Sequence, residues 1–238
     1  MPAWTHYLPI LTTIISAGFA WQILTRYASK PTSKQLLWWG LGIITYGAGT
    51  LVEALTTLVG WQEILFKAWY ILCALLGGAP LALGTVYLLV GRKAGNLAVA
   101  ALLTVVGVTS IFVILSPINI ALVDPHVPNG KVLVWQSVRY VSPFINTFAA
   151  LFLIGGAIYS AIYWLRKGHA FNRFVGNVLI AAGAILPGIG GFLSRMGHTE
   201  ALYVGELVGI ILIWFGYKYC QRPLDPAVLQ VKPSGAQS

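Results

Sequence analysis

Two acidic residues, Glu53 and Glu206, lie inside long apolar stretches of the sequence. Ionisable side chains are rare in such stretches, because a charge is costly in a hydrocarbon environment. If both stretches are helices, each carboxyl group lies about 10 Å of helix rise below the same end of the molecule. Two carboxyl groups at one depth can share a proton, bind a metal ion or an amine, or act as an acid and a base. The two glutamates are therefore the first candidates for a functional site.

Polar side chains accompany both glutamates at the three- or four-residue spacing that places residues on one face of a helix. Two further polar residues, Tyr70 and Asn146, are expected at a similar depth in other apolar stretches. A few convergent polar groups in apolar surroundings are typical of a small-molecule site. The predicted ligand-binding or proton-carrying residues are Glu53, Glu206, Tyr46, Thr50, Thr57, Tyr70, Asn146 and Tyr203.

An alternative interpretation gives the glutamates a structural role. Each would then form a buried ion pair, since ionisable groups within a bilayer are usually paired or solvated. The candidate charge partners are Lys67, at the start of the third apolar stretch, and Arg195, at the end of the sixth. The sequence leaves both interpretations open.

No motif of a known catalytic or metal centre accompanies the glutamates. The chain has no His-Glu-x-x-His, Cys-x-x-Cys or Gly-x-Ser-x-Gly pattern. His6, His126 and His198 fall near one end of the molecule, where a metal ion could bind them with Asp124, but their spacing is not diagnostic. We predict no metal site and no cofactor, and an enzymatic role is the weakest of the hypotheses considered below.

Seven apolar stretches fill the chain almost from end to end. A helix of about 20 mostly apolar residues crosses the roughly 30 Å hydrocarbon core of a bilayer. Hydrophobic residues make up 58% of the chain and charged residues 9%, which leaves too little polar surface for a water-soluble domain. We predict an all-α bundle of seven transmembrane helices in one domain, residues 1–221, followed by a disordered cytoplasmic tail, residues 222–238. The predicted spans are residues 7–24, 36–59, 64–90, 97–115, 141–165, 174–193 and 201–219.

The net charge of +9 is sorted along the chain rather than gathered in one patch. Lys67, Lys131, Arg139 and Arg195 lie on one side of the predicted bundle, and the other Lys and Arg residues lie on the opposite side. The positive-inside rule then predicts a multi-pass protein of the cell membrane, with its N-terminus outside and its C-terminus in the cytoplasm. Basic residues scattered among short loops argue against a nucleic-acid partner and favour contact with lipid headgroups.

Two short turns suggest an internal repeat. Gly, Glu and Leu recur in the same order and spacing in residues 59–65 and 196–202, and each segment joins two spans on the outer side. Spans one to three would then correspond to spans five to seven as a parallel repeat, with span four as a linker. Apolar composition alone can produce the same likeness, so the 3+1+3 order is a hypothesis.

Small residues predict where helices approach closely. Gly205 and Gly209 form a small-xxx-small step in the last span. Pro187 and the neighbouring glycines make the outer part of span six deformable. That segment is expected either to pack tightly against a neighbouring helix or to kink beside a binding cavity.

The predicted topology resembles two families of seven-helix membrane proteins. Microbial rhodopsins share the external N-terminus, but a retinal Schiff base needs a lysine in the middle of the last span. Residues 207–212 contain none and Lys218 lies too close to the inner end, so we expect no retinal. The order of three, one and three spans, with Pro9 and Pro143 in the paired first spans, resembles the sugar-transporting SWEET family in topology alone, since the chain has no Pro-Gln motif.

The leading hypothesis is a protein that binds or transports a small or lipid-like molecule through an outward-facing cavity within the membrane. Glu53 and Glu206 would set its charge preference or carry a proton. The second hypothesis is a receptor or sensor, or an accessory subunit of a membrane complex. The third is an intramembrane enzyme that acts on a lipid. Expected partners are membrane lipids, the ligand itself, and either another membrane protein or further copies of this chain.

Overall fold

A computed structural model describes residues 4–124, 129–168 and 170–223. The described chain is helical, and seven of its helices are long and apolar enough to cross a membrane, which confirms the predicted all-α, seven-helix class. The chain is therefore a multi-pass membrane protein. The predicted tail, residues 222–238, lies almost entirely outside the described residues. The spanning helices are Trp4–Ser29, Lys34–Val59, Glu63–Leu89, Arg92–Leu115, Gln136–Lys167, Phe171–Arg195 and Thr199–Gln221.

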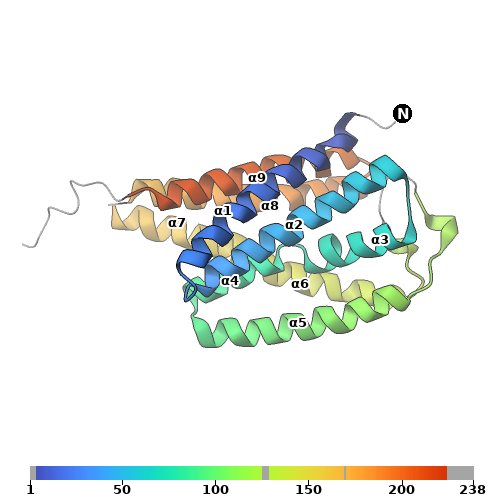
Figure 1. Ribbon diagram of the computed structural model, residues 1–238, viewed down its shortest axis with the longest axis horizontal. Coiled ribbons are helices and arrows are strands. Elements are labelled where there is room, and N and C mark those ends of the chain that lie inside the picture. Colours follow the sequence, from blue (N-terminus) through green and yellow to red (C-terminus); the bar gives the residue numbers. More distant parts are fainter. Residues whose placement is uncertain (1–3, 125–128, 169, 224–238) are drawn as a thin grey trace, which may run out of the picture.

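The long helices alternate in direction and lie side by side (Figure 1). They consist of α1 (Leu8–Ser29), α2 (Lys34–Val59), α3 (Glu63–Trp69) with η2 (Tyr70–Leu76) and α4 (Ala79–Leu89), α5 (Arg92–Leu115), α6 (Val141–Ala149) with η6 (Ala150–Gly155) and α7 (Gly156–Lys167), α8 (Phe171–Arg195), and α9 (Thr199–Gln221). A short helical turn, η1 (Trp4–Tyr7), precedes α1, and three more, η3 (Ile120–Leu122), η4 (Gly130–Val132) and η5 (Gln136–Tyr140), lie between α5 and α6.

The two ends of the bundle carry opposite charge. We call the end with the α2–α3, α5–α6 and α8–α9 connections the acidic end, because Glu63 and Glu200 lie in the first turns of helices there. The end with the α1–α2, α4–α5 and α7–α8 connections is the basic end, and it carries Arg26, Arg92 and Lys167. Most of the helices are longer than the predicted apolar spans, because the helical conformation includes charged residues next to those spans.

Three buried apolar clusters lie in the described part of the molecule, and two of them form the middle of the bundle. One joins α1, α2 and α9 through Phe19, Ile43 and Ile210. The other joins η2, α4, α5 and α6 and includes Leu83 and Ile145. Many large apolar side chains on the outer surfaces of the helices are exposed, as expected where hydrocarbon replaces water as the solvent.

Span three is broken within its length. Gly77, after the π-helical turn η2, has φ +44° and ψ −126°, a conformation that favours glycine. Pro80 follows in the first turn of α4 and has no N–H for the preceding turn. Asn146 Nδ2 donates a 3.2 Å hydrogen bond to the carbonyl of Ala74, so α6 satisfies a backbone group beside the break.

Helices α8 and α9 pack backbone against backbone. A Cβ added to Gly183 would lie 2.6 Å from the carbonyl of Gly209, and one added to Gly205 would lie 2.8 Å from the carbonyl of Leu186. Helix α8 continues through Pro187 without ending. Gly183, Gly190, Gly205 and Gly209 therefore serve close packing, the first of the two expectations from the sequence, whereas Gly188 and Gly191 have open space beside them.

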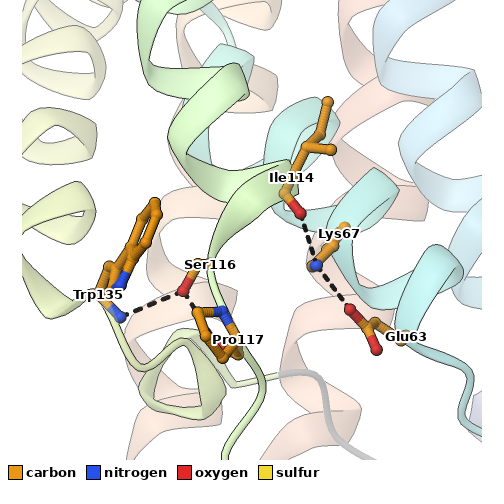
Figure 2. Close-up of polar contacts among 6 residues, drawn as sticks. All are labelled: Glu63, Lys67, Ile114, Ser116, Pro117 and Trp135. Carbon is orange, nitrogen blue, oxygen red and sulfur yellow. Dashed lines mark hydrogen bonds and ion pairs between the residues drawn. The ribbon is translucent and has the colours of Figure 1, made fainter.

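The long connection between α5 and α6 folds over the acidic end of span three (Figure 2). Ser116 Oγ donates to the carbonyl of Pro117 and accepts from the backbone N–H of Trp135, at 3.2 and 3.1 Å. Leu133 of the same connection is buried in a cluster with Phe66 of α3. This connection and α5 fix the position at which α3 begins.

Candidate functional site

Glu53 of α2 and Glu206 of α9 meet inside the bundle. Their side chains are only 2% and 7% exposed. The two carboxyl groups are close enough to interact with each other, although they lie on helices far apart in sequence. The structure thus brings together the two residues that the sequence placed at one depth.

Two residues from span three complete the surroundings of Glu53. The indole Nε1 of Trp69 donates a 2.9 Å hydrogen bond to Glu53 Oε1. One turn before Glu53, the missing side chain of Gly49 leaves room for Cys73, whose Sγ lies 2.5 Å from where a Cβ of Gly49 would be. Close approach of span three to α2 therefore depends on a glycine, and it positions the indole on the carboxylate.

The second carboxylate oxygen of each glutamate has no donor. Glu53 Oε2 and Glu206 Oε2 are both buried, and neither has a hydrogen-bond partner in the described part of the chain. Two ionised carboxylates cannot satisfy each other, because both only accept hydrogen bonds. One proton held between them would turn one carboxyl group into a donor and remove the repulsion between two like charges.

Tyrosines of α2 and α9 surround the pair. The hydroxyl of Tyr46 donates a 2.9 Å hydrogen bond to the backbone carbonyl of Glu206. Tyr203 is buried one turn before Glu206, and its ring makes an edge contact with the ring of His6, with centroids 5.4 Å apart. Thr57 also belongs to this region, since its Oγ1 donates to the carbonyls of His6 and Glu53, both at 3.2 Å.

Three of the predicted site residues lie elsewhere. Thr50 faces α1, where its Oγ1 is 3.0 Å from Oγ1 of Thr13. Tyr70 lies 3.5 Å from Ser142, measured between the hydroxyl oxygens, and Asn146 bonds the broken part of span three. Equal depth in the membrane did not place these side chains on the same side of their helices as the glutamates.

Neither predicted charge partner pairs with the glutamates. Lys67 Nζ instead donates to Glu63 Oε1 at 2.6 Å and to the carbonyl of Ile114 at 2.7 Å, near the surface of the acidic end (Figure 2). Arg195 ends α8 and is exposed, and no ion pair joins it to either glutamate among the described residues. Lys67 lies one turn from Glu63, and this shorter reach explains why it neutralises the exposed acid and not a buried one.

Trp69, Cys73 and the break at Gly77 were not expected from the sequence. Nothing in the pattern distinguishes Trp69 from the other tryptophans of the chain, or Cys73 from a small buried residue. The break did have a signal, because two consecutive glycines precede a proline by one residue. Among the described residues, no group of three or more His, Cys, Asp or Glu side chains is placed to hold a metal ion.

The fold and the buried acidic pair define a multi-pass helical membrane protein with an intramembrane carboxyl dyad. Comparison with protein-family models, with curated proteins and with solved structures finds no match for this chain.

Proposed function

We propose that this protein is a membrane transporter for a small or lipid-like molecule and that the Glu53–Glu206 dyad carries a proton coupled to its movement. The observation that supports this proposal most is that each glutamate has a buried carboxylate oxygen without a donor. A structural pair would be expected to contain a cation or a full set of donors. A pair that binds and releases one proton instead needs carboxylate oxygens that are free to accept that proton.

The hydrogen bond from Trp69 would couple protonation of the dyad to a conformational change of span three. A hydrogen bond to an ionised carboxylate is about twice as strong as one to a neutral group. Loading a proton onto Glu53 would weaken its bond to Trp69 and so loosen the segment formed by α3 and η2. The conformation of Gly77 at the end of that segment offers a joint about which it can move.

Movement of this segment would open the acidic end toward the dyad. The groups that would face an entering ligand there are Tyr46, Cys73, Tyr203 and His6. They combine aromatic surface with few polar atoms, which suits a small molecule with an apolar body and one polar or cationic group.

We also propose the orientation and the repeat that the sequence suggests. The charge difference between the two ends favours an external acidic end in the cell membrane, with the basic end in the cytoplasm. The dyad then takes one carboxyl group from each half of a 3+1+3 arrangement, α2 from the first half and α9 from the second.

Native mass spectrometry from lipid nanodiscs tests the binding step. We expect a discrete mass retained by the parent protein and lost from the double variant Glu53→Gln/Glu206→Gln. Glu200→Gln is the matched control, because Glu200 is an acid of α9 that is exposed at the acidic end. A retained mass that survives in the double variant would contradict a role of the dyad in binding.

Proteoliposomes loaded with the pH indicator pyranine test the coupling. The molecule identified by mass spectrometry is added outside, and the proposal predicts a change of internal pH with the parent protein and with Glu200→Gln. The double variant should give no change. Uptake of the molecule without any proton movement in the parent would contradict proton coupling while leaving transport itself intact.

A further inference from the structure

The basic end carries cations that rest on aromatic rings. Five such contacts occur among the described residues, and all of them belong to this end of α1, α7, α8 and α9. The pairs are Arg26 on Tyr217, Lys167 on Tyr163, Arg173 on Trp164, Lys218 on Trp214 and Arg222 on Tyr219. We call these residues the ring-backed surface.

In the described part of the chain, this end has no acidic side chain to pair with these cations. Every Asp and Glu except Asp225 lies toward the acidic end, and Asp225 is outside the described residues. The positive charge of the ring-backed surface is thus not neutralised by the described protein. A ring attracts a cation through its quadrupole but carries no net charge, so the site as a whole stays positive.

Arg173 and Arg222 have the geometry of an anion site. Their guanidinium carbons lie 4.4 and 4.0 Å from the ring centroids of Trp164 and Tyr219. A guanidinium has five N–H donors in its plane, and a ring below that plane leaves those donors free to bond at the edge. Neither guanidinium donates a hydrogen bond within the described part of the chain, so both can bind the oxygens of a phosphate.

The two arginines come from helices that are joined at this end. Asn177 Nδ2 donates to the carbonyl of Arg173 at 2.7 Å and lies 3.7 Å from Cys220 Sγ, which connects the first turns of α8 to the last turn of α9. Arg222 follows directly after α9. The α8–α9 packing therefore holds both cations on one corner of the bundle.

Compensation of helix dipoles explains only some of the ring-backed cations. Arg26, Lys167 and Lys218 lie in the last turns of α1, α7 and α9, where a cation is favourable. Arg173 lies in the first turn of α8, where the dipole disfavours a positive charge. A favourable interaction with something outside the protein would account for a cation in that position.

We infer that the corner formed by Arg173 and Arg222 binds the phosphate of an anionic phospholipid. The corner lies where the apolar helices end, which is the depth of lipid headgroups, and its charge is complementary to theirs. The rings of Trp164, Trp214 and Tyr219 are typical of the same interfacial depth. This inference does not depend on the proposed transport function.

Titration of the detergent-solubilised full chain with phosphatidylglycerol and phosphatidylcholine of equal acyl length, followed by native mass spectrometry, tests the site. The parent protein should bind phosphatidylglycerol at least about tenfold more tightly, since each basic group near a lipid surface contributes a comparable factor. Arg173→Gln/Arg222→Gln should lose most of that preference.

The control variant also removes two positive charges from the basic end. Lys30 and Lys34 flank the α1–α2 turn, are exposed and rest on no ring, so Lys30→Gln/Lys34→Gln should keep the preference of the parent. If the double arginine variant does not fold, Arg222→Gln alone lies beyond α9 and serves in its place. An equal loss in the lysine control, or no lipid preference in the parent, would overturn the inference.

Discussion

The indole nitrogen of Trp69 lies 2.9 Å from Oε1 of Glu53 and links the broken third span to the buried acidic dyad. The two residues are 16 positions apart, on either side of the α2–α3 turn. This hydrogen bond therefore connects the position of α3 and η2 to the charge of the dyad.

Trp69→Phe removes the donor and keeps most of the ring. Losing a bond of about 1 kcal/mol from the closed state should raise the population of local openings about fivefold. The measurement is the rate at which a thiol reagent labels Cys73, in a Cys220→Ser background because both cysteines are free. Trp21→Phe is the control, since Trp21 is 74% exposed, and its labelling rate should equal that of the parent.

Gly77→Ala should destabilise the protein. A Cβ there would lie 2.8 Å from Asn146 Oδ1, and the backbone has a positive φ. We expect a loss of about 1–3 kcal/mol, seen as a lower thermal midpoint in detergent. Gly107→Ala in α5, where a Cβ has nothing within 4 Å, should be neutral or slightly stabilising. Equal midpoints for the two variants would show that the break at Gly77 is not constrained.

Gly183→Ala tests the α8–α9 interface. The new Cβ would lie 2.6 Å from the carbonyl of Gly209 and 3.0 Å from the backbone nitrogen of Ile213, so the two helices must separate. Overpacking of this kind costs about 1–3 kcal/mol. Gly188→Ala, on the same helix with open space around it, should keep the parent midpoint in the same thermal assay. A parent-like midpoint for Gly183→Ala would contradict the close backbone contact.

A double-mutant cycle tests the contact between the two glutamates. Glu53→Gln and Glu206→Gln each replace the shared proton by an amide N–H that can donate to the remaining carboxylate, so either single variant should raise the thermal midpoint or leave it unchanged. The double variant should fall below the sum of the two single effects, because it has no carboxylate left to accept from an amide. Strict additivity would indicate that the carboxyl groups do not interact.

Much of the fold follows from the sequence because its causes are local. Seven stretches of sufficient length and apolarity predict seven spanning helices, and the described residues contain seven helices of that kind. The depth of Glu53 and Glu206 is also local information, since it depends only on their distance from the helix ends. Both glutamates can therefore be identified as candidates from the sequence alone.

The remaining details depend on how helices rotate about their axes. Thr50 lies less than one turn from Glu53 yet faces Thr13 of α1, while Trp69 reaches the dyad from a different span. Helix rotation is set by contacts such as Cys73 in the space beside Gly49, and no single segment contains both residues. The partner of Lys67 was also not predictable from one segment, since Lys67 pairs with the exposed Glu63 and not with a buried glutamate.

Infrared difference spectroscopy of the reconstituted protein at neutral pH tests the central claim most directly. The account predicts the carbonyl absorption of one protonated, buried carboxyl group, present in the parent and in Glu200→Gln and absent from Glu53→Gln/Glu206→Gln. If the parent shows no protonated carboxyl group, or if its signal persists in the double variant, the dyad does not hold a shared proton and the proposed coupling is wrong.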